Sequence, residues 1–106
     1  MVEDVETFIK HCLTEGRIYW TYHVNMRIRE RDFVRSEILD ALSCCQVIEE
    51  YPSDSPLPSY LVLCTGFLGK VFHSIVALDE INENIRIITV YRPAIEKWSA
   101  DFRSRR

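Results

Sequence analysis

The sequence predicts an α+β domain in which N-terminal helices pack on one face of an antiparallel β-meander that a short C-terminal helix follows. Up to residue 45, apolar side chains recur three and four positions apart, which is the period of amphipathic helices. From residue 46 onward, β-branched and aromatic runs alternate with turn residues, which is the pattern of consecutive strands. With 106 residues, the chain has the length of a single domain, 1–106, with one core.

The helices are predicted from apolar periodicity and from their end signals. Residues 2–15 form the first, and Gly16 follows where a helix end favours a left-handed residue. Residues 17–22 are rich in types that favour a strand, and residues 23–31 hold good helix formers without Gly or Pro. A third helix is expected to begin at Asp32 or Arg35, with an apolar face made of Val34, Ile38, Ala41, Leu42 and Cys45.

The strands are predicted in the second half of the chain. Residues 46–51 read as a strand and residues 52–58 as a loop. Residues 59–65 and 70–79 are joined across Gly66 and Gly69, which predicts a hairpin, and residues 85–91 form the last strand. Pro93 ends that strand, and residues 94–102 suggest a closing helix with Ile95, Trp98 and Phe102 on its inner side.

The composition excludes several classes of protein. Hydrophobic residues make up 47% and charged residues 27%, which is a globular balance, and no apolar run approaches the ~20 residues that span a bilayer. A net charge of -3 argues against a protein whose main task is to coat nucleic acid. None of the four cysteines has Cys-x-x-Cys spacing, so we expect reduced packing residues, no metal and no cofactor, in a cytoplasmic protein.

His23 and His73 are the candidate acid and base. Imidazole titrates near neutrality, so a pair of histidines suits proton removal at one atom and delivery at another. His73 lies in an alternating strand and is expected to be half-buried, and the ordinary reading of such a residue is a packed histidine bonded to a neighbour. Tyr91, at a strand end, could stack a base or handle a proton, or simply cap the sheet edge. Glu30 is a weaker candidate base, and its ordinary readings are an ion-pair partner of Arg27 or a solvated charge.

The candidate substrate-binding residues are arginines. A guanidinium group can donate two parallel hydrogen bonds to phosphate oxygens and stabilise the negative charge that develops in the transition state. On a helical wheel, His23, Arg27 and Glu30 fall within about 60° of each other, with Arg31 next along. Arg92 follows the last strand beside Tyr91. Histidines combined with arginines are typical of RNA cleavage, in which the 2′-hydroxyl is the nucleophile and no metal is required.

Five separated blocks, in order, resemble domain-of-unknown-function family 4258. They are His23-Val-Asn-Met-Arg-Ile-Arg-Glu-Arg31, Val47-Ile-Glu-Glu-Tyr-Pro52, Pro58-Ser-Tyr-Leu-Val-Leu63, His73, and Ile88-Thr-Val-Tyr-Arg-Pro93 through Trp98, Asp101-Phe102 and Arg105-Arg106. The positions that match the family pattern are His23, Arg27, Glu30, Arg31, His73 and Tyr91. Two positions depart from it, namely Cys64 in place of glycine and Val34 in place of a helix-capping Ser or Thr.

The resemblance implies a RelE-like architecture, because members look like distant relatives of RelE-like and BrnT-like ribonuclease toxins. It also implies a partner, since members are often paired with a small zinc-binding antitoxin-type protein. Three functions therefore stay open: a metal-independent endoribonuclease acting on RNA, a non-catalytic module that binds an antitoxin-like partner, and an enzyme acting on a small phosphorylated or acidic metabolite.

Overall fold

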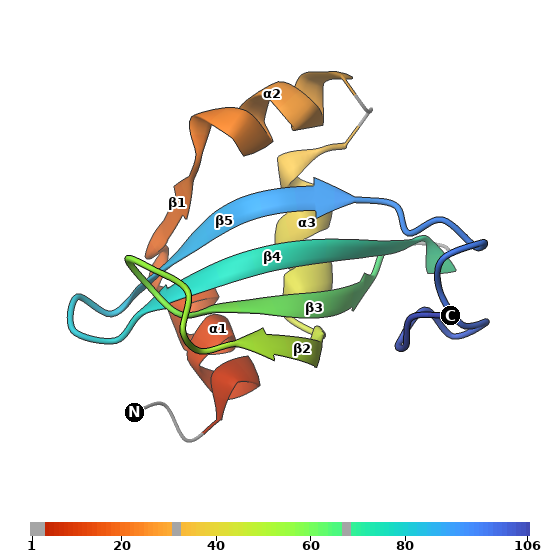
Figure 1. Cartoon of the computed structure of the whole chain (residues 1–106). Coiled ribbons are helices and arrows are strands. Elements are labelled where there is room, and N and C mark those ends of the chain that lie inside the picture. Colours follow the sequence, from red (N-terminus) through yellow and green to blue (C-terminus); the bar gives the residue numbers. More distant parts are fainter. Residues whose placement is uncertain (1–3, 31–32, 67–68) are drawn as a thin grey trace.

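The computed structural model describes residues 4–30, 33–66 and 69–106, and within them it shows three helices and five strands. Helices α1 (Val5–Glu15) and α3 (Arg35–Leu42) lie behind the sheet in Figure 1, whereas α2 (Tyr22–Glu30) lies beyond the edge formed by β1 and β5. The α+β class predicted from the sequence is confirmed. None of the helices in these residues is long and apolar enough to cross a membrane.

The ends of α1 follow from local chemistry. The side chain of Asp4 caps the first turn by accepting a hydrogen bond from the Thr7 amide at 3.2 Å, so the helix begins at Val5. Gly16 closes it with φ of 69°, and its left-handed conformation confirms the predicted end. At α3, Val34 occupies the cap position with no side-chain hydrogen bond, so the first-turn amides of this helix lack a capping side chain.

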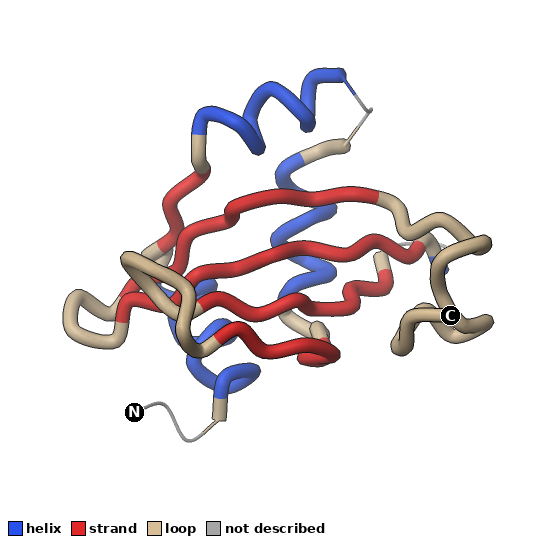
Figure 2. Tube along the Cα trace, viewed as in Figure 1, coloured by secondary structure: helices blue, strands red, loops and turns tan. Residues whose placement is uncertain are grey.

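The sheet is mixed, with strand order β1-β5-β4-β3-β2. The four strands β2 (Gln46–Tyr51), β3 (Ser59–Thr65), β4 (Val71–Asp79) and β5 (Asn84–Tyr91) form the predicted antiparallel meander. The short strand β1 (Ile18–Trp20) was predicted as a strand, but its pairing was not: it runs parallel to β5, with Ile18 opposite Ile85. Figure 2 shows the strands side by side, with α1 and α3 on one side of the sheet.

The main core fills the space between the helices and one sheet face. It contains Ile9, Ile38 and Leu42 from the helices, and Val62 and Ile87 from the sheet, all fully buried. Three cysteines pack in the interior as predicted, while Cys44 is exposed, and all four are free thiols. The opposite, helix-free face carries buried side chains of its own, because alternation turns Leu61, Leu63 and His73 away from the main core.

The predicted C-terminal helix is wrong. After Tyr91 the chain forms turns, and the only strand-like pairing of residues 92–106 is an isolated bridge between Trp98 and Arg105. The hydroxyl of Ser99 donates to Asp101 at 2.6 Å and accepts from the Ser104 amide at 3.2 Å, so side chains satisfy the local backbone where a helix would have done so. Of the predicted inner residues, Trp98 is 3% exposed but Ile95 is 64% exposed. We call residues 92–106 the C-terminal segment.

Candidate functional site

His73 and Tyr91 meet on the helix-free face of the sheet. They are register partners on β4 and β5, and the Nδ1 atom of His73 lies 3.1 Å from the Tyr91 hydroxyl. The Nε2 atom lies 2.9 Å from the carbonyl oxygen of Phe102 in the C-terminal segment. A carbonyl only accepts, so Nε2 carries the proton, Nδ1 is the acceptor, and the Tyr91 hydroxyl donates to it. One backbone carbonyl therefore fixes the tautomer of the imidazole.

The C-terminal segment encloses His73. The imidazole is 0% exposed, and the ring of Trp98 meets it edge-on with the ring centroids 4.4 Å apart. Burial lowers the pKa of His73 below its ordinary value, while the Phe102 carbonyl and the negative charge of Glu49 oppose that shift. Burial likewise raises the pKa of Tyr91. Both effects keep the pair neutral, with the phenol holding its proton.

A charged cluster fastens the C-terminal segment over this pair. Arg105 donates two hydrogen bonds to the Glu49 carboxylate, at 2.8 and 3.1 Å, and its guanidinium lies 4.7 Å from the centre of the Trp98 ring. The Tyr51 hydroxyl also donates to Glu49. The hydrogen bonds from Arg105 and Tyr51 lower the pKa of the Glu49 carboxyl. Sequence reasoning gave Glu49 and Arg105 no role, although both lie within the blocks that resemble the family, because they stand in two separate blocks and only folding joins them.

His23 lies in a different setting, on the exposed side of α2. Its Nε2 accepts a hydrogen bond from Nε of Arg27 at 3.1 Å, which is the contact expected for residues four apart on a helix. Glu30, at the end of α2, is exposed. Arg31, the fourth residue of the predicted stripe, lies outside the described residues. The structure thus confirms that His23 and Arg27 are neighbours.

The two histidines are not brought together by any contact among the described residues. The polar and ring partners of His73 are Tyr91, Phe102 and Trp98, whereas His23 bonds to Arg27. Arg92 does not join His73 either. Successive residues of an extended chain point to opposite sides, and the guanidinium of Arg92 lies over Phe33 of the main core, 4.8 Å from the ring centre.

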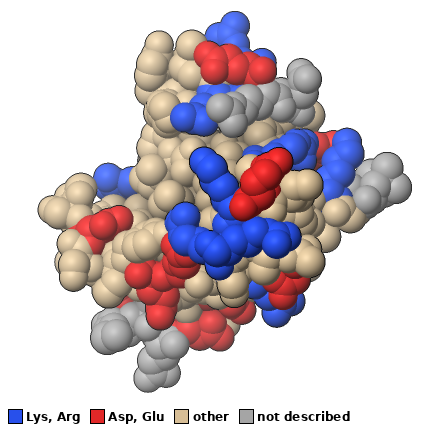
Figure 3. Space-filling view, turned by 45° about the vertical axis from the view of Figure 1, so that its right-hand side comes forward, with Lys and Arg blue, Asp and Glu red and all other residues tan. Residues whose placement is uncertain are grey.

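The surface around the C-terminal segment gathers cations although the whole chain is acidic. Figure 3 shows Lys and Arg side chains concentrated on this face, with a few carboxylates among them. The basic residues of the segment are Arg92, Lys97, Arg103, Arg105 and Arg106. Within the described residues, no three His, Cys, Asp or Glu side chains lie close enough together to hold a metal ion.

Comparison with known proteins gives one match. A family model described as Domain of unknown function (DUF4258) matches residues 20–92, which include both histidines and Tyr91. No curated protein and no solved structure matches the chain significantly. The RelE-like architecture therefore stays a prediction.

Proposed function

Since the chain belongs to the DUF4258 family, whose description names no activity, we propose from the geometry of its site that it is a cytoplasmic ribonuclease of the toxin type. The proposal depends most on one observation, the chain of hydrogen bonds from the Phe102 carbonyl through His73 to Tyr91. An oriented imidazole that accepts from a hydroxyl is the arrangement by which enzymes activate a proton-carrying group.

Tyr91 is the member of the pair that would meet the substrate. It is partly exposed, whereas His73 lies fully enclosed behind it. The phenol oxygen donates to His73 and keeps lone pairs with which it can accept from the 2′-hydroxyl of RNA. As that hydroxyl attacks the phosphorus, its proton passes to Tyr91 and the phenol proton passes to Nδ1 of His73. The pair then returns this proton to the departing 5′-oxygen.

The charges around the pair support both halves of this transfer. The imidazolium formed in the first half donates to the Phe102 carbonyl and is attracted by Glu49, and both contacts oppose the lowering of the His73 pKa by burial. Lys97, Arg103, Arg105 and Arg106 of the C-terminal segment attract the RNA backbone. Arg27, which bonds to His23, is proposed to extend the phosphate contacts and makes α2 a separate region for binding RNA. Arg31 is proposed as a further phosphate contact, although it lies outside the described residues.

The test is cleavage of single-stranded RNA by purified protein, with Tyr91→Phe as the main variant. This change keeps the ring and removes the hydroxyl, so we expect the rate to fall by about 10²- to 10⁴-fold, the range of one acid–base group. His73→Gln should lose a similar factor. The products should carry 2′,3′-cyclic phosphates, and DNA of the same sequence should stay intact because it lacks the nucleophile.

The matched control is His11→Gln, which changes an exposed histidine of α1 far from Tyr91 in sequence. It should cleave like the wild type. Full activity in a folded Tyr91→Phe protein, or a folded wild type that cleaves no RNA, would show that the proposal is wrong.

A second candidate is a module that binds a protein partner, such as the small zinc-binding antitoxin-type protein that the family resemblance implies. The observation that favours it is an exposed aromatic pair beside the edge strand β1: Tyr19 is 61% exposed and Tyr22 is 80% exposed. Exposed tyrosines and an unpaired strand edge are features by which such modules bind partners. Co-purification of a stoichiometric partner that is lost in a Tyr19→Ser, Tyr22→Ser protein would support this candidate.

A further inference from the structure

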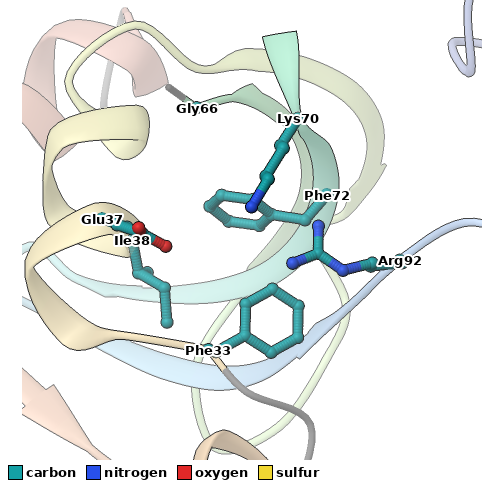
Figure 4. Close-up of a pocket in the computed structure, with 7 residues that line it drawn as sticks. All are labelled: Phe33, Glu37, Ile38, Gly66, Lys70, Phe72 and Arg92. Atoms are coloured by element: carbon teal, nitrogen blue, oxygen red, sulfur yellow. The ribbon is translucent and has the colours of Figure 1, made fainter. Parts of the chain in front are cut away.

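A second candidate site lies on the helix side of the sheet, across from Tyr91. A small hollow opens there between α3 and the neighbouring ends of β4 and β5 (Figure 4). Its walls are formed by Phe33, Glu37, Ile38, Gly66, Lys70, Phe72 and Arg92. Its volume of about 30 Å³ is room for roughly two water molecules, so it suits one small group of a ligand, not a whole base.

Two cations converge on this hollow. The guanidinium of Arg92 lies over Phe33, Lys70 lines the same hollow, and Figure 4 shows both charged ends turned toward the same space. Within residues 4–30, 33–66 and 69–106, neither cation lies within 4.0 Å of a carboxylate oxygen. An anion that enters the hollow would therefore meet two positive charges that have no carboxylate partner among the residues that the structure describes.

Glu37 distinguishes this hollow from a simple anion site. Its carboxylate, on α3, points into the same space in Figure 4. A carboxylate repels a bare anion but accepts hydrogen bonds from hydroxyl and amino groups. Two cations and one carboxylate therefore favour a ligand that carries both an anionic group and a hydrogen-bond donor.

We propose that this hollow binds the phosphate group of a nucleotide. Lys70 and Arg92 hold the phosphate, and Glu37 accepts from a ribose hydroxyl or a base amino group that remains outside the hollow. This site is separate from the proposed cleavage pair, because Arg92 lies over the main core while Tyr91 faces the helix-free side. Binding here therefore does not require RNA cleavage, and the two proposals can fail independently.

The experiment is an NMR titration of the folded full-length chain with inorganic phosphate, adenosine 5′-monophosphate and adenosine. We expect saturable shifts at the amides of residues 33–38 and 69–72 with the nucleotide, and none with adenosine. Lys70→Gln should weaken nucleotide binding about tenfold or more, which is the loss expected for one charge-assisted contact. Lys10→Gln, which removes an exposed cation from α1, should bind like the wild type.

Glu37→Gln separates the two possible sources of the phosphate. Loss of the carboxylate should weaken nucleotide binding and strengthen binding of inorganic phosphate. Unchanged nucleotide binding in this variant would overturn the assignment of a nucleotide. Equal weakening by Lys70→Gln and Lys10→Gln, or no saturable binding by the wild type, would overturn the site itself. If Arg92→Gln does not fold because Phe33 loses its neighbour, Lys70→Gln still decides the question.

Discussion

His73 and His23 carry the same side chain in opposite settings. His73 is 0% exposed, both of its ring nitrogens are hydrogen-bonded, and the Trp98 ring packs against it. His23 lies on the exposed side of α2 with one hydrogen bond, to Arg27 four residues along the same helix. The first environment requires strands, register and the C-terminal segment to be in place, whereas the second requires only a helix.

This difference separates the roles that the two side chains can have. The imidazole of His73 has one tautomer and one orientation, so it can transfer a proton only through Tyr91. His23 is exposed, so it can contact a ligand directly, and its hydrogen-bond partner within the described part of the chain is Arg27 of the same helix. The role of a histidine that transfers a proton through another side chain therefore depends more on the tertiary structure than the role of a histidine that contacts a ligand directly.

The largest expected effect is a loss of stability when the Trp98 ring, which packs against His73, is removed. Trp98→Ala removes a ring that is 3% exposed, so we expect the free energy of unfolding to fall by about 3–5 kcal/mol, the usual loss for a buried tryptophan. The measurement is chemical denaturation. Ile95→Ala, at a position that is 64% exposed in the same segment, should change the free energy by less than about 0.5 kcal/mol. Equal losses in both variants would mean that the C-terminal segment does not pack on His73.

The next largest effect is the difference in stability loss between alanine variants of the two histidines. His73→Ala leaves the Tyr91 hydroxyl and the Phe102 carbonyl without their partner, so we expect a loss of about 1–3 kcal/mol in the free energy of unfolding. His23→Ala should stay within about 0.5 kcal/mol of the wild type, because its site is exposed. Denaturant midpoints of the two variants measure the contrast, and a larger loss at His23 would reverse the comparison.

The sequence predicted most of the sheet and the C-terminal end of α1. Alternation around His73 placed it on a strand face, and Gly16 marked the end of α1. The closing helix was wrong because residues 94–102 have helical apolar spacing, but Ser99 and Asp101 bond to the nearby backbone instead. Parallel pairing of β1 with β5 has no local signal, since it joins residues that lie far apart along the chain.

The candidate site was predictable only in part for the same reason. His73, Tyr91, His23 and Arg27 were identified by residue type, and the pairing of His23 with Arg27 follows from helical spacing alone. Glu49 and Arg105 lie in two separate blocks of the family resemblance, and no local pattern predicts the ion pair by which they join β2 to the C-terminal segment. The opposite orientation of Arg92 and Tyr91 follows from strand alternation, which separates neighbours in sequence onto two faces.

The smallest expected effect is on the pH dependence of stability. The pKa of His73 is lowered in the folded chain, so below its ordinary value of about 6.5 the unfolded chain takes up a proton that the folded chain does not. The free energy of unfolding therefore falls as the pH drops from about 6.5 toward the folded pKa, by less than about 1.4 kcal/mol per pH unit. Above pH 7 the contribution of His73 to the free energy of unfolding does not change with pH. Carboxylates with lowered pKa values, such as Asp79, lose their contribution only near and below pH 4.

Denaturation of the wild type and of His73→Gln between pH 7.5 and 5 tests this expectation. The variant should show a flatter slope across that range, because glutamine fills much of the site without titrating. Lys10→Gln, on the exposed side of α1, should keep the slope of the wild type. If the free energy of unfolding changes with pH in the same way for the wild type and His73→Gln, the buried imidazole takes up its proton as readily as a free one. Burial would then not separate His73 from an exposed histidine in its protonation.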